Sequence, residues 1–129
     1  MKRKCLFLVI ALVLVFGSVS VVSAYSWSAT VNANRTSNTS ARVSADITYT
    51  TTVDSATNKI TLQEKYNGSW RTATGVPVKT VSRTKSNVRS LSLPYTFTLV
   101  KGKVYRAKAD FTSKKGSSTI TKTFYSNVF

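Results

Sequence analysis

The side chains in this sequence that could do chemistry are mostly cations, and one stretch concentrates them. Residues 101–115, KGKVYRAKADFTSKK, carry six lysines and arginines and a single acid, Asp110. Apolar side chains alternate with these charges from Tyr105 to Phe111, as they do on the buried side of a strand. Arginine and lysine beside hydroxyl groups suit the oxygens of phosphate. The stretch predicts a strand whose outer face either binds anions or is merely solvated.

Acidic and nucleophilic side chains are too few to predict an active site. The chain has one cysteine, no histidine and four acids, which are Asp46, Asp54, Glu64 and Asp110. A catalytic pair of carboxylates needs two acids close together, and zinc sites or histidine-activated nucleophiles need residue types that are missing after residue 24. We therefore expect no enzyme activity, no cofactor and no metal site.

Glu64 does not fit the alternation around it. It shares the parity of Ile60 and Leu62, so a regular strand would point its carboxylate into the core, where an unpaired charge is costly. One interpretation is that the strand bulges or leaves the core after Leu62. The other is that Glu64 is a functional anion beside an arginine or a lysine.

Residues 1–24 have the layout of a secretory signal peptide. A positive start at 2–4 precedes an apolar run at 5–16, and Val-Ser-Ala at 22–24 offers the small residues that a signal peptidase reads. A membrane anchor is the rival interpretation, but glycine and serine interrupt the apolar run before it ends. We expect cleavage after the last of these residues and one secreted domain at 25–129, which either stays on the cell wall or diffuses away.

The charge of this secreted domain is strongly positive. It holds sixteen cations, four acids and no cysteine, which gives a net charge of +12. Without disulfides, its fold must rest on apolar burial. Most of its cations lack an acid to pair with, so the domain should attract anions.

Period-two alternation runs through residues 25–129 and predicts an all-β fold. Short alternating runs are separated by turn residues, which is typical of a seven-stranded antiparallel sandwich. The expected turns lie at 34–39, 54–58 and 114–117, with a polar connection at 79–87 and a tight Asn-Gly hairpin at 67–68.

The segment LVKGKVY, residues 99–105, resembles the sixth-strand entry of fibronectin type III domains, a branch of the immunoglobulin-like sandwiches. The shared pattern is Leu-x-x-Gly-x-x-Tyr, formed here by Leu99, Gly102 and Tyr105. The resemblance implies a turn at Gly102 and a tyrosine corner. In such a corner the buried Tyr105 bonds its hydroxyl to the backbone just upstream.

A second segment, LQEKYNGSW at 62–70, resembles the third strand of such domains and its hairpin. It would place Asn67 and Gly68 in the turn and Trp70 on the returning strand. The whole chain also resembles small secreted proteins of Gram-positive bacteria. These resemblances imply a secreted fibronectin type III-like sandwich and no particular activity.

The aromatic side chains mostly keep the parity of the core, so we expect them to pack inside rather than to stack on sugars. Tyr25, Tyr125 and Phe129 are the exceptions, because they do not follow this parity. For Tyr66 and Trp70 both packing inside and stacking on a ligand stay possible interpretations, because these residues flank an exposed hairpin.

Cations on the third and sixth strands predict a basic outer face. The expected anion-binding residues are Lys65, Arg71, Arg106 and Lys108. Their expected partner is an anionic polymer of the cell envelope, such as teichoic acid, with peripheral membrane or wall association and no sequence-specific nucleic-acid binding. The alternative is a secreted protein-interaction or effector module, antibacterial or adhesive, that uses a sheet edge or the hairpin.

Overall fold

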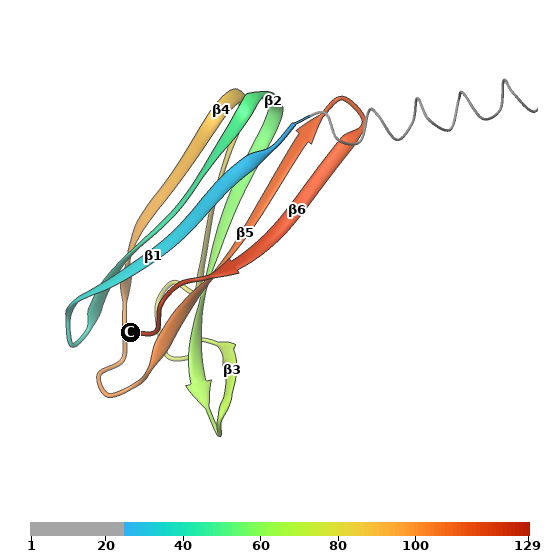
Figure 1. The fold of residues 1–129 in the computed structure, drawn as a ribbon. Coiled ribbons are helices and arrows are strands. Elements are labelled where there is room, and N and C mark those ends of the chain that lie inside the picture. The colour runs from blue at the N-terminus through green and yellow to red at the C-terminus, as the bar shows by residue number, and fades with distance from the viewer. Residues whose placement is uncertain (1–24) are drawn as a thin grey trace, which may run out of the picture.

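Six antiparallel strands form one strongly curled, half-barrel sheet (Figure 1). The computed structural model describes residues 25–129. The expected signal peptide, with Cys5, lies outside the described residues. The all-β prediction is therefore confirmed for the described chain. The strands are β1 (Trp27–Ser37), β2 (Ser40–Tyr66), β3 (Ser69–Thr72), β4 (Thr80–Thr98), β5 (Tyr105–Lys115) and β6 (Ser118–Tyr125).

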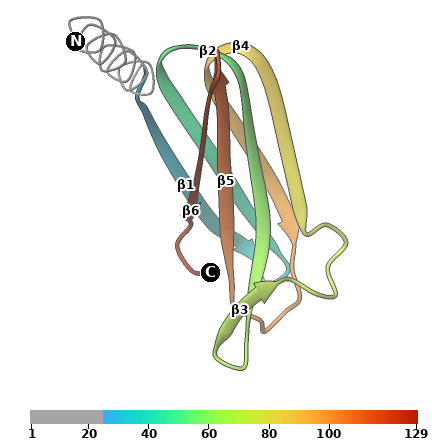
Figure 2. The same ribbon diagram turned by 90° about the vertical axis from the view of Figure 1, so that its right-hand side faces the viewer.

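Strand β2 organises the sheet because its 27 residues reach into both halves of the curl. Its first half lies between β1 and the second half of β4. Its second half lies between β5 on one side and, on the other, the first half of β4 and then β3. Figure 2 shows β2 and β4 running the length of the molecule, with the β3 hairpin at one end.

The expected turn at 54–58 and the expected connection at 79–87 are both wrong. The missing turn joins two predicted strands into β2, which is why six strands replace the predicted seven. Residues 54–58 continue β2, and β4 already begins at Thr80. The strand bends instead near an irregularity between Thr48 and Val53. Asn58 is a typical turn residue, yet it lies fully buried in the second half of β2. The core tolerates its amide because the amide donates hydrogen bonds to the carbonyls of Ala45 and Leu91 at 3.0 and 2.9 Å.

The core lies inside the curl, and β5 shows how the sequence builds it. Its odd-numbered residues, from Tyr105 to Ser113, are all buried, whereas the even-numbered ones between them are only half-buried. The alternation predicted for this strand is therefore correct. In β2 the buried parity changes from odd at Ala41–Tyr49 to even at Ala56–Glu64, because β2 has three more residues than β4 across the irregularity, and an odd number reverses the parity.

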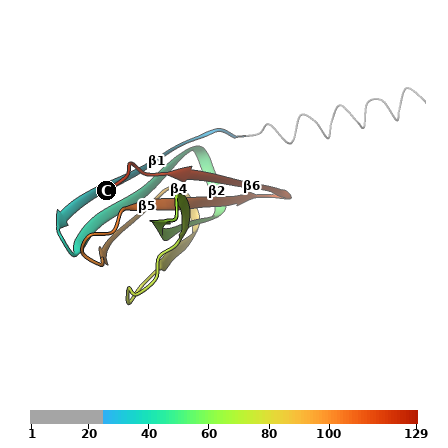
Figure 3. The same cartoon turned by 90° about the horizontal axis from the view of Figure 1, so that it is seen from below.

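The open side of the curl is narrowed by side chains and by the C-terminal segment. The rings of Trp27 on β1 and Phe124 on β6 meet there with centroids 5.8 Å apart. Figure 3 shows the two strands on the same side of the curl. Beyond β6, the side chain of Asn127 bonds both backbone groups of Ala33 on β1, at 3.1 and 2.9 Å. Phe129 pairs with the backbone of Tyr105. No helix within 25–129 is long and apolar enough to span a membrane.

Candidate anion-binding face

The outward side of β3, β2, β5 and β6 carries a continuous set of cations and aromatics, which we call the outer face. Register brings its members together: Gln63 lies opposite Arg106, Lys65 opposite Trp70, and Lys108 opposite Tyr125. In a sheet, residues paired across strands point to the same side. The outer face comprises Lys59, Gln63, Lys65, Trp70, Arg106, Lys108, Asp110, Lys114 and Tyr125.

The outer face is strongly positive because its five cations outnumber its single acid. The carboxylate of Asp110 accepts a hydrogen bond from the hydroxyl of Thr123 at 2.5 Å. Both ion pairs found among residues 25–129 involve Glu64, which lies on the other side of the sheet. The five lysines and arginines of the outer face are therefore without an acidic partner in the described chain.

Of the four predicted anion-binding residues, the structure brings three onto this face and separates the fourth. Lys65, Arg106 and Lys108 point outward as expected. Arg71 lies opposite Glu64 in the β2–β3 register, so it has the inward parity and not the expected outward one. A two-residue hairpin at 67–68 fixes this arrangement, because it pairs Trp70, and not Arg71, with Lys65.

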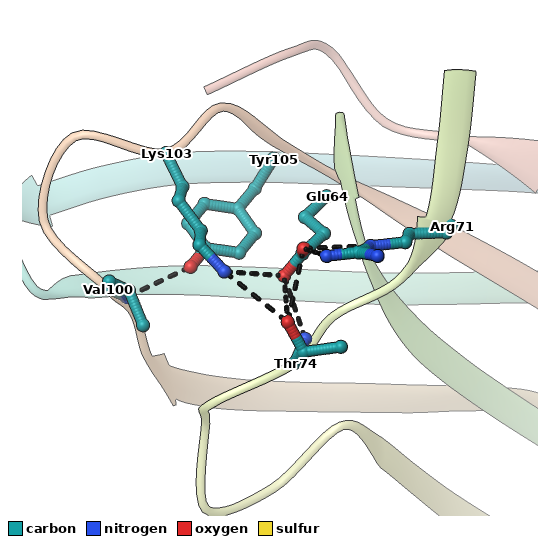
Figure 4. A network of polar contacts seen from close by, with 6 residues as sticks. All are labelled: Glu64, Arg71, Thr74, Val100, Lys103 and Tyr105. Carbon is teal, nitrogen blue, oxygen red and sulfur yellow. Dashed lines mark hydrogen bonds and ion pairs between the residues drawn. The ribbon is translucent and has the colours of Figure 1, made fainter. Parts of the chain in front are cut away.

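Glu64 is held by a network that joins four parts of the chain (Figure 4). Its Oε2 accepts hydrogen bonds from Nε and Nη2 of Arg71 at 3.0 and 2.8 Å. Its Oε1 accepts from the backbone N–H of Thr74 at 2.7 Å and from Nζ of Lys103 at 3.1 Å. The hydroxyl of Thr74 adds a further contact. A carboxylate with so many donors is stable in the charged form.

The side chain of Glu64 is only 1% exposed, so the interpretation in which the strand leaves the core after Leu62 is wrong. Burial alone would raise the pKa of Glu64. The donors from Thr74, Arg71 and Lys103 outweigh burial and lower its pKa to about 2. The carboxylate is thus beside an arginine and a lysine, as the other interpretation expected, and its contacts connect strands rather than face a ligand.

The turn next to this network contains the hydrogen bond that the sequence resemblance implies. The ring of Tyr105 is fully buried, and its hydroxyl accepts a hydrogen bond from the backbone N–H of Val100 at 2.9 Å (Figure 4). Leu99 is buried in the core, and Gly102 has a φ of 87°, which a side chain would strain. These residues shape the entry to β5.

The predicted hairpin turn also has left-handed backbone at both central positions. Asn67 has a φ of 50° and Gly68 a φ of 79°, as the Asn-Gly pair favours. The turn projects β3 from the end of the sheet. It is the element that carries Trp70 back over the outer face.

The sequence left Trp70 and Tyr125 open as surface aromatics, but it did not predict that Arg106 lies against both of them. The Cζ of Arg106 lies 4.5 Å from the ring centroid of Trp70 and 4.0 Å from that of Tyr125. Nζ of Lys65 lies 6.0 Å from the Trp70 centroid. The pairing rule for a two-residue hairpin could have predicted that Trp70 points outward, because it places position 70 opposite the outward-facing Lys65.

Residues 25–129 contain no cluster of three or more acids, cysteines or histidines that could hold a metal ion. No known protein-family model matches the chain, and no curated protein is similar enough in sequence to count as a relative.

Proposed function

We propose that this protein is a secreted, non-enzymatic module that binds anionic polymers with a phosphodiester backbone through its outer face. The observation that carries the proposal is the set of five outward cations without an acidic partner among the described residues. Phosphodiester chains present one negative charge per unit, and a flat basic face can follow several units at once. Teichoic acids of the bacterial envelope are polymers of this kind.

The fold that we propose for this module is a fibronectin type III-like sandwich within the curled sheet. One layer would comprise β1, the first half of β2 and the second half of β4. The other would comprise β3, the first half of β4, the second half of β2, β5 and β6. The hydrogen bond between Val100 and Tyr105 supports this proposal because it has the geometry of a tyrosine corner.

Binding would be electrostatic and would involve little reshaping of the protein. The outer face lies on paired strands, so its backbone is already ordered and the lysines supply charge at fixed positions. Hydroxyl side chains lie among them, including Thr61 opposite Lys108 and Thr121 opposite Thr112. These hydroxyls can donate hydrogen bonds to phosphate oxygens between the charges.

The test compares two charge reversals in the secreted form, residues 25–129. Lys65→Glu with Lys108→Glu changes the outer face, whereas Lys85→Glu with Lys122→Glu makes the same change at exposed positions of the opposite parity. Affinity for poly(glycerol phosphate) is measured across a salt series. We expect the first variant to lose about tenfold or more at about 50 mM salt and the control to lose much less.

The affinity of the unchanged protein should fall steeply as salt rises, because added ions screen charges on exposed surfaces. Absence of binding at low salt, or equal losses of affinity in the two variants, would contradict the proposal. Salt-insensitive binding of a protein partner through a sheet edge would favour the interaction module instead.

A further inference from the structure

Arg106 is the most constrained cation of the outer face. Its guanidinium contacts Trp70 from β3 and Tyr125 from β6, with 4.5 and 4.0 Å from Cζ to the ring centroids. Its Nε donates a hydrogen bond to Oε1 of Gln63 at 2.8 Å. An arginine on a strand surface usually has many rotamers, and these three contacts remove most of that freedom.

The constraint leaves the terminal nitrogens of Arg106 available. Within residues 25–129, neither Nη1 nor Nη2 of this residue donates to a protein acceptor, and Arg106 has no ion pair. By contrast, the arginine that serves the fold, Arg71, uses Nε and Nη2 on the carboxylate of Glu64. Arg106 thus presents a rigid pair of N–H groups to solvent.

A planar pair of N–H donors matches two oxygens of one phosphate group. Flanking charge supports the same ligand: Lys65 lies beside Trp70 and Lys108 lies beside Tyr125, so cations stand on both sides of the guanidinium. Asp110, the acid of this face, is bonded to Thr123. We propose that Arg106 is the phosphate-recognising centre of the outer face, and that its terminal N–H groups bind one phosphodiester of the polymer in bidentate fashion.

This inference rests on the proposed function and makes it more specific. Diffuse attraction depends on the number of cations, so it would not distinguish arginine from lysine at position 106. A bidentate centre does distinguish them, because an ammonium group lacks the planar fork. The aromatic rings have a role in this scheme, since they hold the fork at a fixed angle before the ligand arrives.

The competing explanation is that the stack merely connects β3 to β6. Cation–π contacts of this kind can stabilise a fold even at exposed sites. A purely structural stack would make Arg106→Lys less stable while leaving its affinity for phosphate polymers near that of the unchanged protein.

The decisive experiment keeps the charge constant. Arg106→Lys is compared with Arg83→Lys, an exposed arginine whose register partner is the inward-facing Asn58. Binding of a poly(glycerol phosphate) oligomer and of a polyglutamate of equal length is measured for folded protein, as judged by thermal unfolding. We expect Arg106→Lys to weaken binding of the phosphate oligomer about tenfold, and Arg83→Lys to change it less than twofold.

A second measurement needs no change at Arg106. In a Trp27→Phe protein the fluorescence comes from Trp70 alone, whose ring lies against the guanidinium. The side-chain Nε–H resonance of Arg106 can be followed by NMR in the same titration. Both signals should shift and saturate together with the phosphate oligomer.

The outcomes separate the two levels of the proposal. Absence of any polymer binding at low salt overturns the proposed function and this inference with it. Salt-sensitive binding that is equal in Arg106→Lys and the unchanged protein leaves the proposed function standing and overturns the inference. An arginine fork can also bind a carboxylate, so equal affinity for polyglutamate and for the phosphate oligomer would show that the site does not prefer phosphate, which overturns the phosphate-recognising role.

Discussion

Arg71 and Arg106 show that strand parity decides what a charged residue does here. Both arginines lie on strands next to the second half of β2, and both contact an aromatic ring. Arg71 points inward, where its donors satisfy Glu64, although its side chain is still 41% exposed. Arg106 points outward, where its terminal nitrogens have no acceptor among the described residues. A shift of either strand by one residue would exchange these roles.

Glu64→Gln tests the buried network at the scale of one side chain. The amide keeps the size of the carboxylate but removes the charge that faces Arg71 and Lys103, so we expect the free energy of unfolding to fall by about 2 kcal/mol at pH 7. Chemical denaturation measures it. Asp110→Asn is the matched control, and its stability should stay within about 0.5 kcal/mol of the unchanged protein.

The same residue gives the protein a pH dependence with a definite sign. The pKa of Glu64 is lowered from 4.5 to about 2 in the folded state, so its stabilising contribution is complete above pH 4.5 and is lost as the pH falls toward 2. Glu64→Gln should therefore approach the stability of the unchanged protein over this window. A stability difference that stays constant from pH 7 to pH 2 would contradict the network as described.

The strands themselves were predictable where alternation and turn chemistry agree, and not where they conflict. β5 and the Asn67–Gly68 hairpin follow directly from apolar parity and from a turn that needs left-handed backbone. The continuity of β2 does not. Asp, Ser and Asn at 54–58 are turn residues by composition, and only the tertiary structure shows that Asn58 finds two carbonyl acceptors inside the curl. Hydrogen bonds to acceptors this far away in the sequence leave no signal in the residues around Asn58.

Asn58→Asp tests whether that amide connects the two halves of the sheet. Ala45 lies in the first half of β2, Leu91 in the second half of β4, and Asn58 in the second half of β2. A carboxylate cannot donate to the two carbonyls, so we expect a loss of more than about 2 kcal/mol at neutral pH. Asn32→Asp, at an exposed position of β1, is the control and should change stability little. Equal unfolding midpoints for the two variants would show that the buried amide is dispensable.

At the scale of the whole molecule, charge was the property that could be predicted, and its placement was not. Composition alone gives the excess of cations. The outer face needed the register, because Trp70 and Arg106 meet across β2 from strands that are distant in sequence. The inward position of Arg71 likewise depends on the length of one hairpin.

This excess of charge should make the stability of residues 25–129 depend on ionic strength. With a net charge of +12 and both ion pairs of the described chain at Glu64, repulsion among cations opposes the compact state. Raising sodium chloride from about 20 to about 300 mM shortens the screening length to well under 10 Å, so the unfolding temperature should rise by a few degrees. A fall would mean that favourable ion pairs dominate instead.

Poly(glycerol phosphate) at low salt should also raise the unfolding temperature, because a ligand of the folded state stabilises it. Lys65→Glu with Lys108→Glu should lose that second increase while keeping the response to sodium chloride.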